Sequence, residues 1–381
     1  MKLDSYDNIP SPCFLLEKEL LVKNLELIKD VQERSGADII LALKAFAMWR
    51  VFPLIGEYLP SATASSLHEA RLIFEEMGRK AHVYAPAYLP EEFEKMLGYA
   101  SHLTFNSLRQ YERFKDEVIS HPQQVSMGLR VNPQAASSAV DMYNPSLPGS
   151  RFGILAEQLG DTLPEGIEGL HLHVLCEADS YALESVLEAF EAKFGHLFPQ
   201  LKWVNMGGGH LMTRKGYDLE HVVGLLNSFR EKHKVEVILE PGSAIAWETG
   251  VLVSSVMDIV ENHEIKTAIL DVSFTAHMPD TLEMPYQPKV LGAESSAIEG
   301  KEVYRLGGSS CLSGDFIGDY SFDQPLDVGD KVILLDMIHY TTVKTTMFNG
   351  IKHPSLGILK KGGIFELVRE FGYEDYKNRL S

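Results

Sequence analysis

Two kinds of apolar pattern alternate along the chain between residues 17 and 250. Segments with apolar residues at helical spacing predict helices, and the short apolar runs between them predict strands. The predicted helices are 17–36, 65–80, 89–100, 107–118, 180–198 and 219–234. The predicted strands are 38–45, 81–87, 102–106, 125–133, 167–175, 201–209 and 235–242. Strand–helix alternation repeated about eight times predicts an α/β fold, a (β/α)8 barrel, with an open doubly wound sheet as the alternative.

The pattern changes after residue 250, where strand-like runs follow one another with few helices between them. These runs are 251–262, 266–273, 301–308, 330–338 and 364–370, and the N-terminal run 11–17 resembles them. We therefore predict two domains, a barrel over 17–248 and a β-rich domain, sandwich-like or barrel-like, made of 1–16 with 249–381.

Composition narrows the class of protein. The 381 residues carry a net charge of −18, with 45% hydrophobic and 23% charged residues. This balance is typical of a globular protein and argues against nucleic acid as a partner, since phosphate binding needs clustered cations. No apolar run is long enough to span a membrane and no secretory signal is visible, so we expect a cytoplasmic protein. Cys13, Cys176 and Cys311 show no paired spacing, which argues against disulfides and a zinc site.

Lys44 is an unexpected residue in the apolar strand predicted at 38–45. Burial lowers the pKa of an ammonium group, and the neutral amine is a nucleophile that forms Schiff bases with carbonyl compounds. A lysine at a strand end can also extend its ammonium group into solvent, and Lys44 taken alone favours this explanation. Because barrels carry their functional groups at the C-terminal ends of strands, the other strand ends decide between the two.

Three further features lie at the ends of predicted strands. His171 and His173 share one face of a strand, where an imidazole can stack on an aromatic ligand, and metal ligation is disfavoured because no partner set lies at metal spacing. The run Gly207–Gly209 lets backbone N–H groups approach an anion such as phosphate. Glu240 ends an apolar strand, where a carboxylate needs a partner. Each feature alone also has a structural explanation: a core histidine, a tight turn or a salt bridge.

Together the four features complement one ligand. A lysine binds an aldehyde, glycines hold a phosphate, a carboxylate faces a protonated ring nitrogen, and a histidine covers the ring. Pyridoxal 5'-phosphate has all of these groups.

Many short blocks along the chain resemble the fold-type III pyridoxal-phosphate decarboxylases, the group of ornithine, diaminopimelate and carboxynorspermidine (carboxyspermidine) decarboxylases. The carboxynorspermidine branch is the most similar. The blocks, in chain order, are SGADIILALKAFAMW, FNSLRQ, GLRVNP, SRFGI, WVNMGGGH, GYD, EPG, DIVEN, KTAILD, AHMPDT, SSCLSGD, FDQPLDVGD and YTTVK with FNG. The resemblance covers nearly the whole chain and implies a barrel with a second β domain, and a homodimer with shared active sites.

The resemblance also implies roles in cofactor binding. Lys44 would form the Schiff base, His173 would stack on the pyridine ring, and Glu240 would pair with its nitrogen. Gly207, Gly208 and Gly209 would hold the phosphate with the help of Tyr340, and Arg130 would reach the ring 3-hydroxyl.

For the substrate, the resemblance implies a carboxylate-rich site for a polyamine-like amino acid. Cys311 and Asp315 match the loop that enters the neighbouring subunit's site, and Cys311 would return a proton to the α-carbon. Asp280 matches a substrate-binding aspartate, and Asp280, Asp315 and Glu177 would meet the distal amines of the substrate. Ser243 departs from the acidic residue that usually follows EPG in this branch.

The expected reaction is removal of the α-carboxylate of carboxynorspermidine or carboxyspermidine in polyamine biosynthesis. Because of Ser243, decarboxylation of diaminopimelate, ornithine, lysine or a siderophore citryl-diamine precursor remains an alternative. An amino-acid racemase and a non-catalytic barrel that binds the cofactor are less favoured. The racemase motifs are not found in register, and the non-catalytic barrels lack the β domain.

Overall fold

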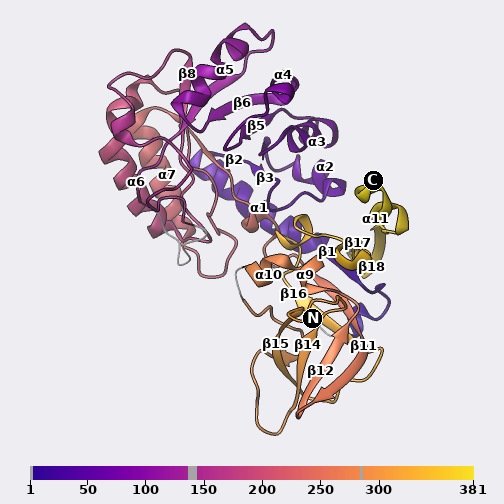
Figure 1. The fold of residues 1–381 in the computed structure, drawn as a ribbon. Coiled ribbons are helices and arrows are strands. Elements are labelled where there is room, and N and C mark those ends of the chain that lie inside the picture. The colour runs from indigo at the N-terminus through magenta and orange to yellow at the C-terminus, as the bar shows by residue number, and fades with distance from the viewer. Residues whose placement is uncertain (1–2, 136–143, 284–285) are drawn as a thin grey trace. The chain divides into compact units, whose positions relative to one another are not determined.

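The alternation seen in the sequence produces a parallel sheet that closes on itself (Figure 1). This computed structural model describes residues 3–135, 144–283 and 286–381. The strands of the closed sheet follow the order β2-β10-β9-β8-β7-β6-β5-β4-β3. They are β2 (Asp38–Ile39), β3 (Leu41–Ala42), β4 (Ala62–Ala64), β5 (Ala81–Tyr84), β6 (Ala100–Phe105), β7 (Ser126–Arg130), β8 (Ile167–His171), β9 (Trp203–Asn205) and β10 (Glu236–Leu239).

The two short strands β2 and β3 occupy one position in the barrel. Only Ile40 separates them; its N–H donates to Leu239 O, whereas the N–H of Leu41 donates to Ser61 O. β2 pairs with β10 and β3 pairs with β4, both in parallel. The nine assigned strands therefore fill eight positions, and the predicted (β/α)8 barrel is confirmed.

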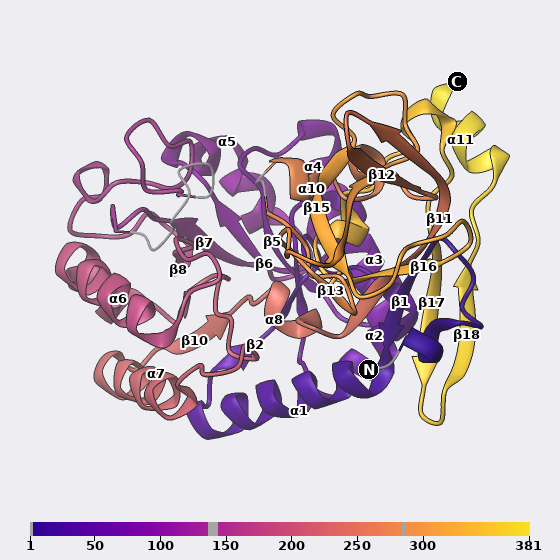
Figure 2. The same cartoon turned by 90° about the horizontal axis from the view of Figure 1, so that it is seen from below.

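Helices follow most of the strands, as the apolar spacing predicted. They are α1 (Lys18–Ser35), α2 (Phe52–Ile55), α3 (Leu67–Met77), α4 (Pro90–Tyr99), α5 (Leu108–Ser120), α6 (Ser180–Phe194), α7 (Leu219–His233) and α8 (Ser243–Ala246). Figure 2 shows α6 and α7 outside the barrel strands, beside β8 and β10. Side-chain caps start several of these helices, and Ser66, for example, accepts the N–H of Glu69 at the start of α3.

Strand β4 was missed from the sequence. Its residues Ala62, Thr63 and Ala64 are small and show no apolar alternation. Parallel pairing with β3 and β5 holds this segment extended, so its strand state comes from its neighbours rather than from its own composition.

Trp203 fills the interior of the barrel, together with Ile40 and Ile238. Its indole Nε1 donates to Ser126 Oγ at 2.8 Å. A Cβ added to Gly169 would lie 2.0 Å from Trp203 Cδ2, and one added to Gly128 would lie 2.3 Å from Trp203 Cη2. Glycine at these two strand positions therefore makes room for the indole.

The N-terminal halves of β5 and β6 carry two stacked imidazoles, those of His82 and His102. The rings of His82 and His102 lie 4.0 Å apart, and His102 also makes an edge contact with Trp203. Burial lowers the pKa of His82 to about 3 and that of His102 to about 4. Both are thus neutral in the folded barrel at ordinary pH.

This pair predicts a pH dependence of stability. An unfolded histidine takes up a proton below about pH 6.5, whereas the folded pair does so only near pH 3 to 4. The contribution of this pair to the free energy of unfolding is therefore fully present above about pH 6.5 and is lost as the pH falls below that value. Each histidine should lower the free energy of unfolding by up to about 1.4 kcal/mol per pH unit between pH 6 and 4. Denaturant unfolding of His82→Phe should show a shallower slope than wild type. The exposed-site control His68→Gln should keep the wild-type slope, and equal slopes for all three proteins would refute the assignment.

The second unit is built on a mixed sheet, which confirms the predicted β-rich domain. Its strands follow the order β13-β15-β14-β12-β11-β1-β17-β18, and β16 pairs with β11. They are β1 (Cys13–Glu17), β11 (Gly250–Asn262), β12 (Ile265–Leu270), β13 (Ala293–Glu294), β14 (Glu302–Gly307), β15 (Phe316–Phe322), β16 (Lys331–Leu335), β17 (Ser355–Lys360) and β18 (Ile364–Arg369). The short helices α9 (Phe274–His277) and α10 (Pro279–Glu283) and the C-terminal α11 (Tyr373–Leu380) complete it.

Contacts divide the chain into Asn24–Ile245, which holds the barrel, and a unit that joins the residues before Asn24 to Ala246–Ser381. The N-terminal strand β1 pairs with β11 and β17, which explains why the unit contains both ends of the chain. The domain boundaries predicted at 17 and 248 stay a prediction. Within the described ranges, no helix is long and apolar enough to cross a membrane.

Candidate active site

Lys44 lies just after β3, in the turn that leaves the C-terminal end of this barrel strand. Its Nζ is 3.3 Å from Nε2 of His173, which follows β8. The Lys44 side chain keeps an exposed surface, but barrel atoms surround it, and this desolvation lowers its pKa. The negative charge of Glu240 opposes the shift and the positive charge of Arg130 adds to it. The site thus shifts the protonation equilibrium of Lys44 toward the neutral amine.

His173 is held in one tautomer. Its Nδ1 accepts the N–H of Gly208 at 2.9 Å, so the ring proton of the neutral imidazole sits on Nε2. Burial, followed by the charges of Lys44 and Arg130, lowers the pKa of His173 well below its usual value. The Nε2–H group therefore points at the lone pair of Lys44, and the ring stays uncharged.

The glycine run makes close backbone contacts. A Cβ on Gly207, whose φ is +67°, would lie 2.5 Å from Leu172 O, and one on Gly208 would lie 2.5 Å from Glu240 O. The N–H of Gly208 is taken by His173, as described above, and that of Gly207 donates to Asn205 Oδ1 at 2.8 Å. This leaves the N–H of Gly209 without a side-chain acceptor in the described residues. The phosphate role of the run stays a prediction, and Gly209 is its best-placed member.

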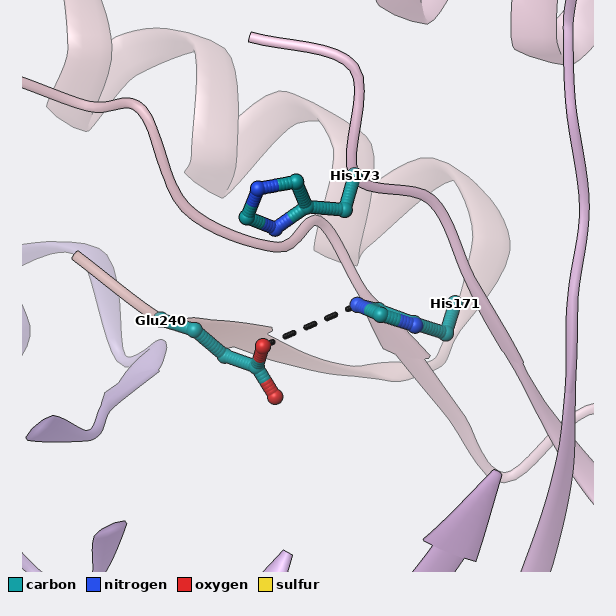
Figure 3. Close-up of side chains that lie close together, drawn as sticks. All are labelled: His171, His173 and Glu240. Atoms are coloured by element: carbon teal, nitrogen blue, oxygen red, sulfur yellow. Dashed lines mark ion pairs between the residues drawn. The ribbon is translucent and has the colours of Figure 1, made fainter. Parts of the chain in front are cut away.

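Glu240 is buried directly after β10 and has two partners, of which Figure 3 shows His171. Asn205 Nδ2 donates to its Oε1 at 2.7 Å, and His171 Nε2 lies 3.6 Å from its Oε2. Burial by itself would raise the pKa of Glu240, but His171 and the Asn205 amide outweigh it and lower the pKa to about 2. Burial lowers the pKa of His171, whereas its hydrogen bond with Glu240 and the charge of that carboxylate oppose the shift.

Arg130 ends β7 and lies among aromatic rings. Its guanidinium carbon is 4.7 Å from the ring centre of Tyr84 and 4.5 Å from that of Phe152. Its Nη2 donates to His173 O at 2.9 Å, which anchors the backbone beside the imidazole. Burial lowers the pKa of Arg130, but a guanidinium remains charged at any ordinary pH. The contact of Arg130 with the ring 3-hydroxyl stays a prediction.

The prediction that no partner set at metal spacing lies near His171 and His173 is wrong, because Glu240, from another strand, lies beside them. His171, His173 and Glu240 each offer a ligand atom, and these atoms lie within 4.8 Å of one another (Figure 3). The neighbouring charge of Arg130, which depresses the pKa of both histidines, favours an anionic ligand over a divalent cation.

Two of the predicted substrate residues lie in the barrel unit. Ser243 is buried at the start of α8, directly after Gly242. Glu177 is exposed in the loop after β8 and has a left-handed backbone, with φ of 45°. Their contacts with substrate stay a prediction.

The other predicted residues belong to the β-rich unit. Asp280 Oδ2 accepts the hydroxyls of Thr341 at 2.9 Å and Tyr286 at 3.2 Å, whereas its buried Oδ1 has no partner among the described residues. Tyr340, with φ of 43°, precedes the short helix that begins at Thr341. Its phosphate contact stays a prediction.

The predicted catalytic loop is anchored at two points. Asp315 is buried, and its Oδ1 and Oδ2 accept the N–H groups of Thr275 at 2.9 Å and Ser310 at 3.0 Å. Cys311 is exposed, and its N–H donates to Asn349 Oδ1 at 2.8 Å. Both oxygens of Asp315 accept backbone N–H groups, so the side chain supports the geometry of the loop, and each oxygen keeps a second lone pair for a further donor. Its predicted contact with substrate stays untested, as does proton transfer by Cys311.

Sequence reasoning missed two side chains of the site. Asn205 precedes the glycine run and looked like a turn residue, although it contacts Glu240. Glu69 caps α3 by accepting the N–H of Ser65 at 2.6 Å, and it lies close enough for its charge to interact with Lys44. The serine cap followed three residues later by glutamate was visible as a helix-start signal, but its place beside Lys44 was not.

The residues present fit pyridoxal phosphate. A neutral Lys44 amine suits the aldehyde, the ionised Glu240 suits a protonated ring nitrogen, and His173 presents an uncharged ring. Gly209 offers a backbone N–H at the end of a β-carbon-free run. The donor set therefore matches each functional group of this cofactor.

The fold and these residues are those of a pyridoxal-phosphate-dependent enzyme. A family model described as "pyridoxal-dependent decarboxylase, C-terminal sheet domain" matches residues 13–338. This span is most of the chain, and the chain belongs to this decarboxylase family, which confirms the predicted family, enzyme class and cofactor.

Similar proteins narrow the class further. The chain is 52% identical to a carboxyaminopropylagmatine decarboxylase of Synechocystis sp., over 98% of this chain and 96% of that protein. It is 44% identical to a carboxynorspermidine/carboxyspermidine decarboxylase of Campylobacter jejuni, over 98% and 99%. The crystal structure of carboxynorspermidine decarboxylase from C. jejuni, complexed with norspermidine, has a TM-score of 0.90 and covers 97% of this chain and 100% of its own, at 44% identity.

Proposed function

We propose that this enzyme removes the α-carboxylate of an amino acid in which a carboxyaminopropyl group is joined to a cationic amine tail. Carboxynorspermidine and carboxyspermidine, expected from the sequence, are such compounds, and their products are norspermidine and spermidine. The observation that carries the proposal is the contact of Lys44 Nζ with the Nε2 of a tautomerically fixed His173, beside the ionised Glu240.

The chemistry divides between cofactor and protein. Pyridoxal phosphate, when bound, supplies an electron sink for the pair of electrons left by carbon dioxide. Lys44 would hold the cofactor through its aldehyde, since desolvation lowers the pKa of this amine. The Glu240 carboxylate, held by Asn205, would face the ring nitrogen and favour its protonated form, and His173 would cover the ring. The thiol of Cys311 would return a proton to the α-carbon.

The substrates named for the relatives share one head group. Carboxynorspermidine, carboxyspermidine and carboxyaminopropylagmatine all carry the carboxyaminopropyl unit on an amine, and they differ in the tail. The first two end in an ammonium group and the third ends in the guanidinium group of agmatine. The reacting atoms are therefore the same, and only the distal contacts must change.

The side chain of Asp280 is evidence for a cationic tail on the substrate. Thr341 and Tyr286 donate to one carboxylate oxygen and aim the side chain, while the other oxygen, Oδ1, is buried without a partner in the described residues. A buried, unpaired carboxylate oxygen is costly, and a substrate ammonium or guanidinium group would satisfy it by a charge-assisted hydrogen bond.

The guanidinium tail is the second candidate, favoured by the 52% identity to the carboxyaminopropylagmatine enzyme. Ser243 agrees with it, because a neutral hydroxyl stands where this branch usually offers an acid to the amines. The two candidates differ in substrate, not in reaction type.

A panel of substrates tests the proposal. Carbon dioxide release should be fastest with carboxynorspermidine, carboxyspermidine or carboxyaminopropylagmatine, and at least about 100-fold slower, by kcat/KM, with ornithine, lysine and diaminopimelate, which lack the carboxyaminopropyl-amine arrangement. Asp280→Asn should raise KM for the preferred substrate more than it lowers kcat. A preference for ornithine or diaminopimelate would overturn the proposal, and the order among the first three assigns the tail.

We further propose a homodimer in the cytoplasm. The exposed Cys311, in a loop anchored by Asn349, is suited to enter the site of a second subunit. Three free cysteines, one of them exposed, fit a reducing compartment.

A further inference from the structure

Asn205 joins the two halves of the site. It ends β9, is 4% exposed, and uses both ends of its amide: Nδ2 donates to Glu240 Oε1 at 2.7 Å, and Oδ1 accepts the N–H of Gly207 at 2.8 Å. One side chain thus contacts both the carboxylate expected at the ring nitrogen and the first residue of the glycine run.

The amide can take only one orientation. An ionised carboxylate accepts hydrogen bonds and cannot donate, so the NH2 group must face Glu240. The backbone N–H of Gly207 donates and cannot accept, so the carbonyl oxygen must face Gly207. A rotated amide would place like groups together at both ends, and both buried contacts would be lost.

The backbone around Asn205 holds the amide in place. Its carbonyl oxygen accepts the N–H of Leu172 at 2.8 Å, and the next residue, Met206, donates its N–H to Ile238 O at 2.8 Å. These bonds fix the end of β9 between β8 and β10, the strands that lead to His173 and Glu240. The Asn205 amide is therefore held in a fixed position between Glu240 and the glycine run.

We infer that Asn205 is a positioning residue that keeps Glu240 ionised and aimed at the cofactor ring while it sets the start of the glycine run. The inference rests on the cofactor role proposed for Glu240. An aspartate here would keep the acceptor for Gly207, but it would put a second carboxylate against Glu240, and the pair would then share a proton. An alanine would remove both contacts.

A double-mutant cycle tests whether Asn205 acts through Glu240. Asn205→Ala should weaken pyridoxal phosphate binding to the apoenzyme by about 10- to 100-fold, the scale for losing a buried bond to a charged group or a supporting ligand contact. In the Glu240→Gln background the same change should cost clearly less, because the charge that Asn205 supports is gone and only the loss of the Gly207 contact remains. Binding is measured by cofactor titration, and the folded state of each apoenzyme by its melting temperature.

The variant Asn205→Asp gives a second test, a pH dependence that a purely structural role of Asn205 would not change. Cofactor affinity and the visible spectrum of the bound cofactor should gain a titration between about pH 5 and 8 that wild type lacks, because two facing carboxylates share a proton. The matched control is Asn132→Ala. Asn132 is another buried amide, but it contacts Pro145 O and the N–H of Gln134. The variant Asn132→Ala should leave the visible spectrum of the bound cofactor and the pH dependence of that spectrum unchanged.

The outcomes separate this inference from the proposed function. If wild type binds pyridoxal phosphate but the cycle is additive and Asn205→Asp shows no new titration, the role of Asn205 is wrong and the enzyme assignment stands. If wild type binds no pyridoxal phosphate, the proposed function itself fails. A cycle with strong coupling and a new titration establishes the inference, including where Asn205→Ala is poorly folded, since Asn205→Asp keeps the Gly207 contact.

Discussion

Lys44→Ala is expected to abolish decarboxylation, with a loss of roughly 10⁴-fold or more in kcat, the scale seen when a group that acts chemically is removed. The reason is that Lys44 supplies the amine at the end of β3, 3.3 Å from His173 Nε2, and desolvation lowers the pKa of this amine. The variant should also lose the absorbance of covalently held cofactor, and mass spectrometry after borohydride reduction should find no cofactor mass on the chain. Wild type should carry it on Lys44.

Two controls make this result specific. Lys44→Arg keeps a cation but its guanidinium does not lose a proton, so it should be as inactive as Lys44→Ala. Lys95→Ala, on helix α4, should retain wild-type turnover. Turnover of Lys44→Ala within tenfold of wild type would show that this amine is not the group that binds the cofactor.

The same variant reports on the proposed dimer. If Cys311 serves the site of a neighbouring subunit, Lys44→Ala mixed with Cys311→Ala should recover activity that neither variant has alone, since a hybrid contains one intact site. Sedimentation of the mixture shows whether dimers have formed. Dimers without recovered activity would contradict shared sites.

Glu240→Gln is expected to lower kcat by about 10²- to 10³-fold, the scale for removing one preorganised electrostatic contact. The amide keeps the shape of the side chain but cannot carry the negative charge that holds a proton on the ring nitrogen. KM should change much less than kcat. Steady-state kinetics and the cofactor spectrum measure both effects.

The pH dependence of Glu240 adds a check. His171 and Asn205 lower its pKa to about 2, so its charge is present above that value and is lost only as pH falls toward 2. Wild-type activity between pH 5 and 9 should therefore show no titration from this carboxylate. Glu236→Gln, at the exposed start of the same strand, is the matched control and should remain fully active. A kcat of Glu240→Gln within threefold of the wild-type kcat would refute the role proposed for the Glu240 charge.

Much of the barrel could be predicted because its strands are buried on both faces and its helices are amphipathic. Lys44, His173 and Glu240 could be proposed because each places a polar group at the end of an apolar run. Strand β4 could not, since Ala62–Ala64 has no pattern of its own and is extended by its neighbours. Asn205 could not either, because an asparagine before glycines is also what a turn contains.

The sequence by itself determined the fold class, the second β domain and the family, together with the residue types that a pyridoxal-phosphate site requires. These follow from spacing along the chain, which periodicity and ordered motifs record. Only the tertiary structure decided where the protons and partners lie: the Gly208 N–H that sets the tautomer of His173, the amide of Asn205 on Glu240, and the backbone groups that occupy Asp315. The physical reason is that hydrogen bonds depend on distances of about 3 Å between groups on separate strands and loops, and spacing along one strand does not encode them.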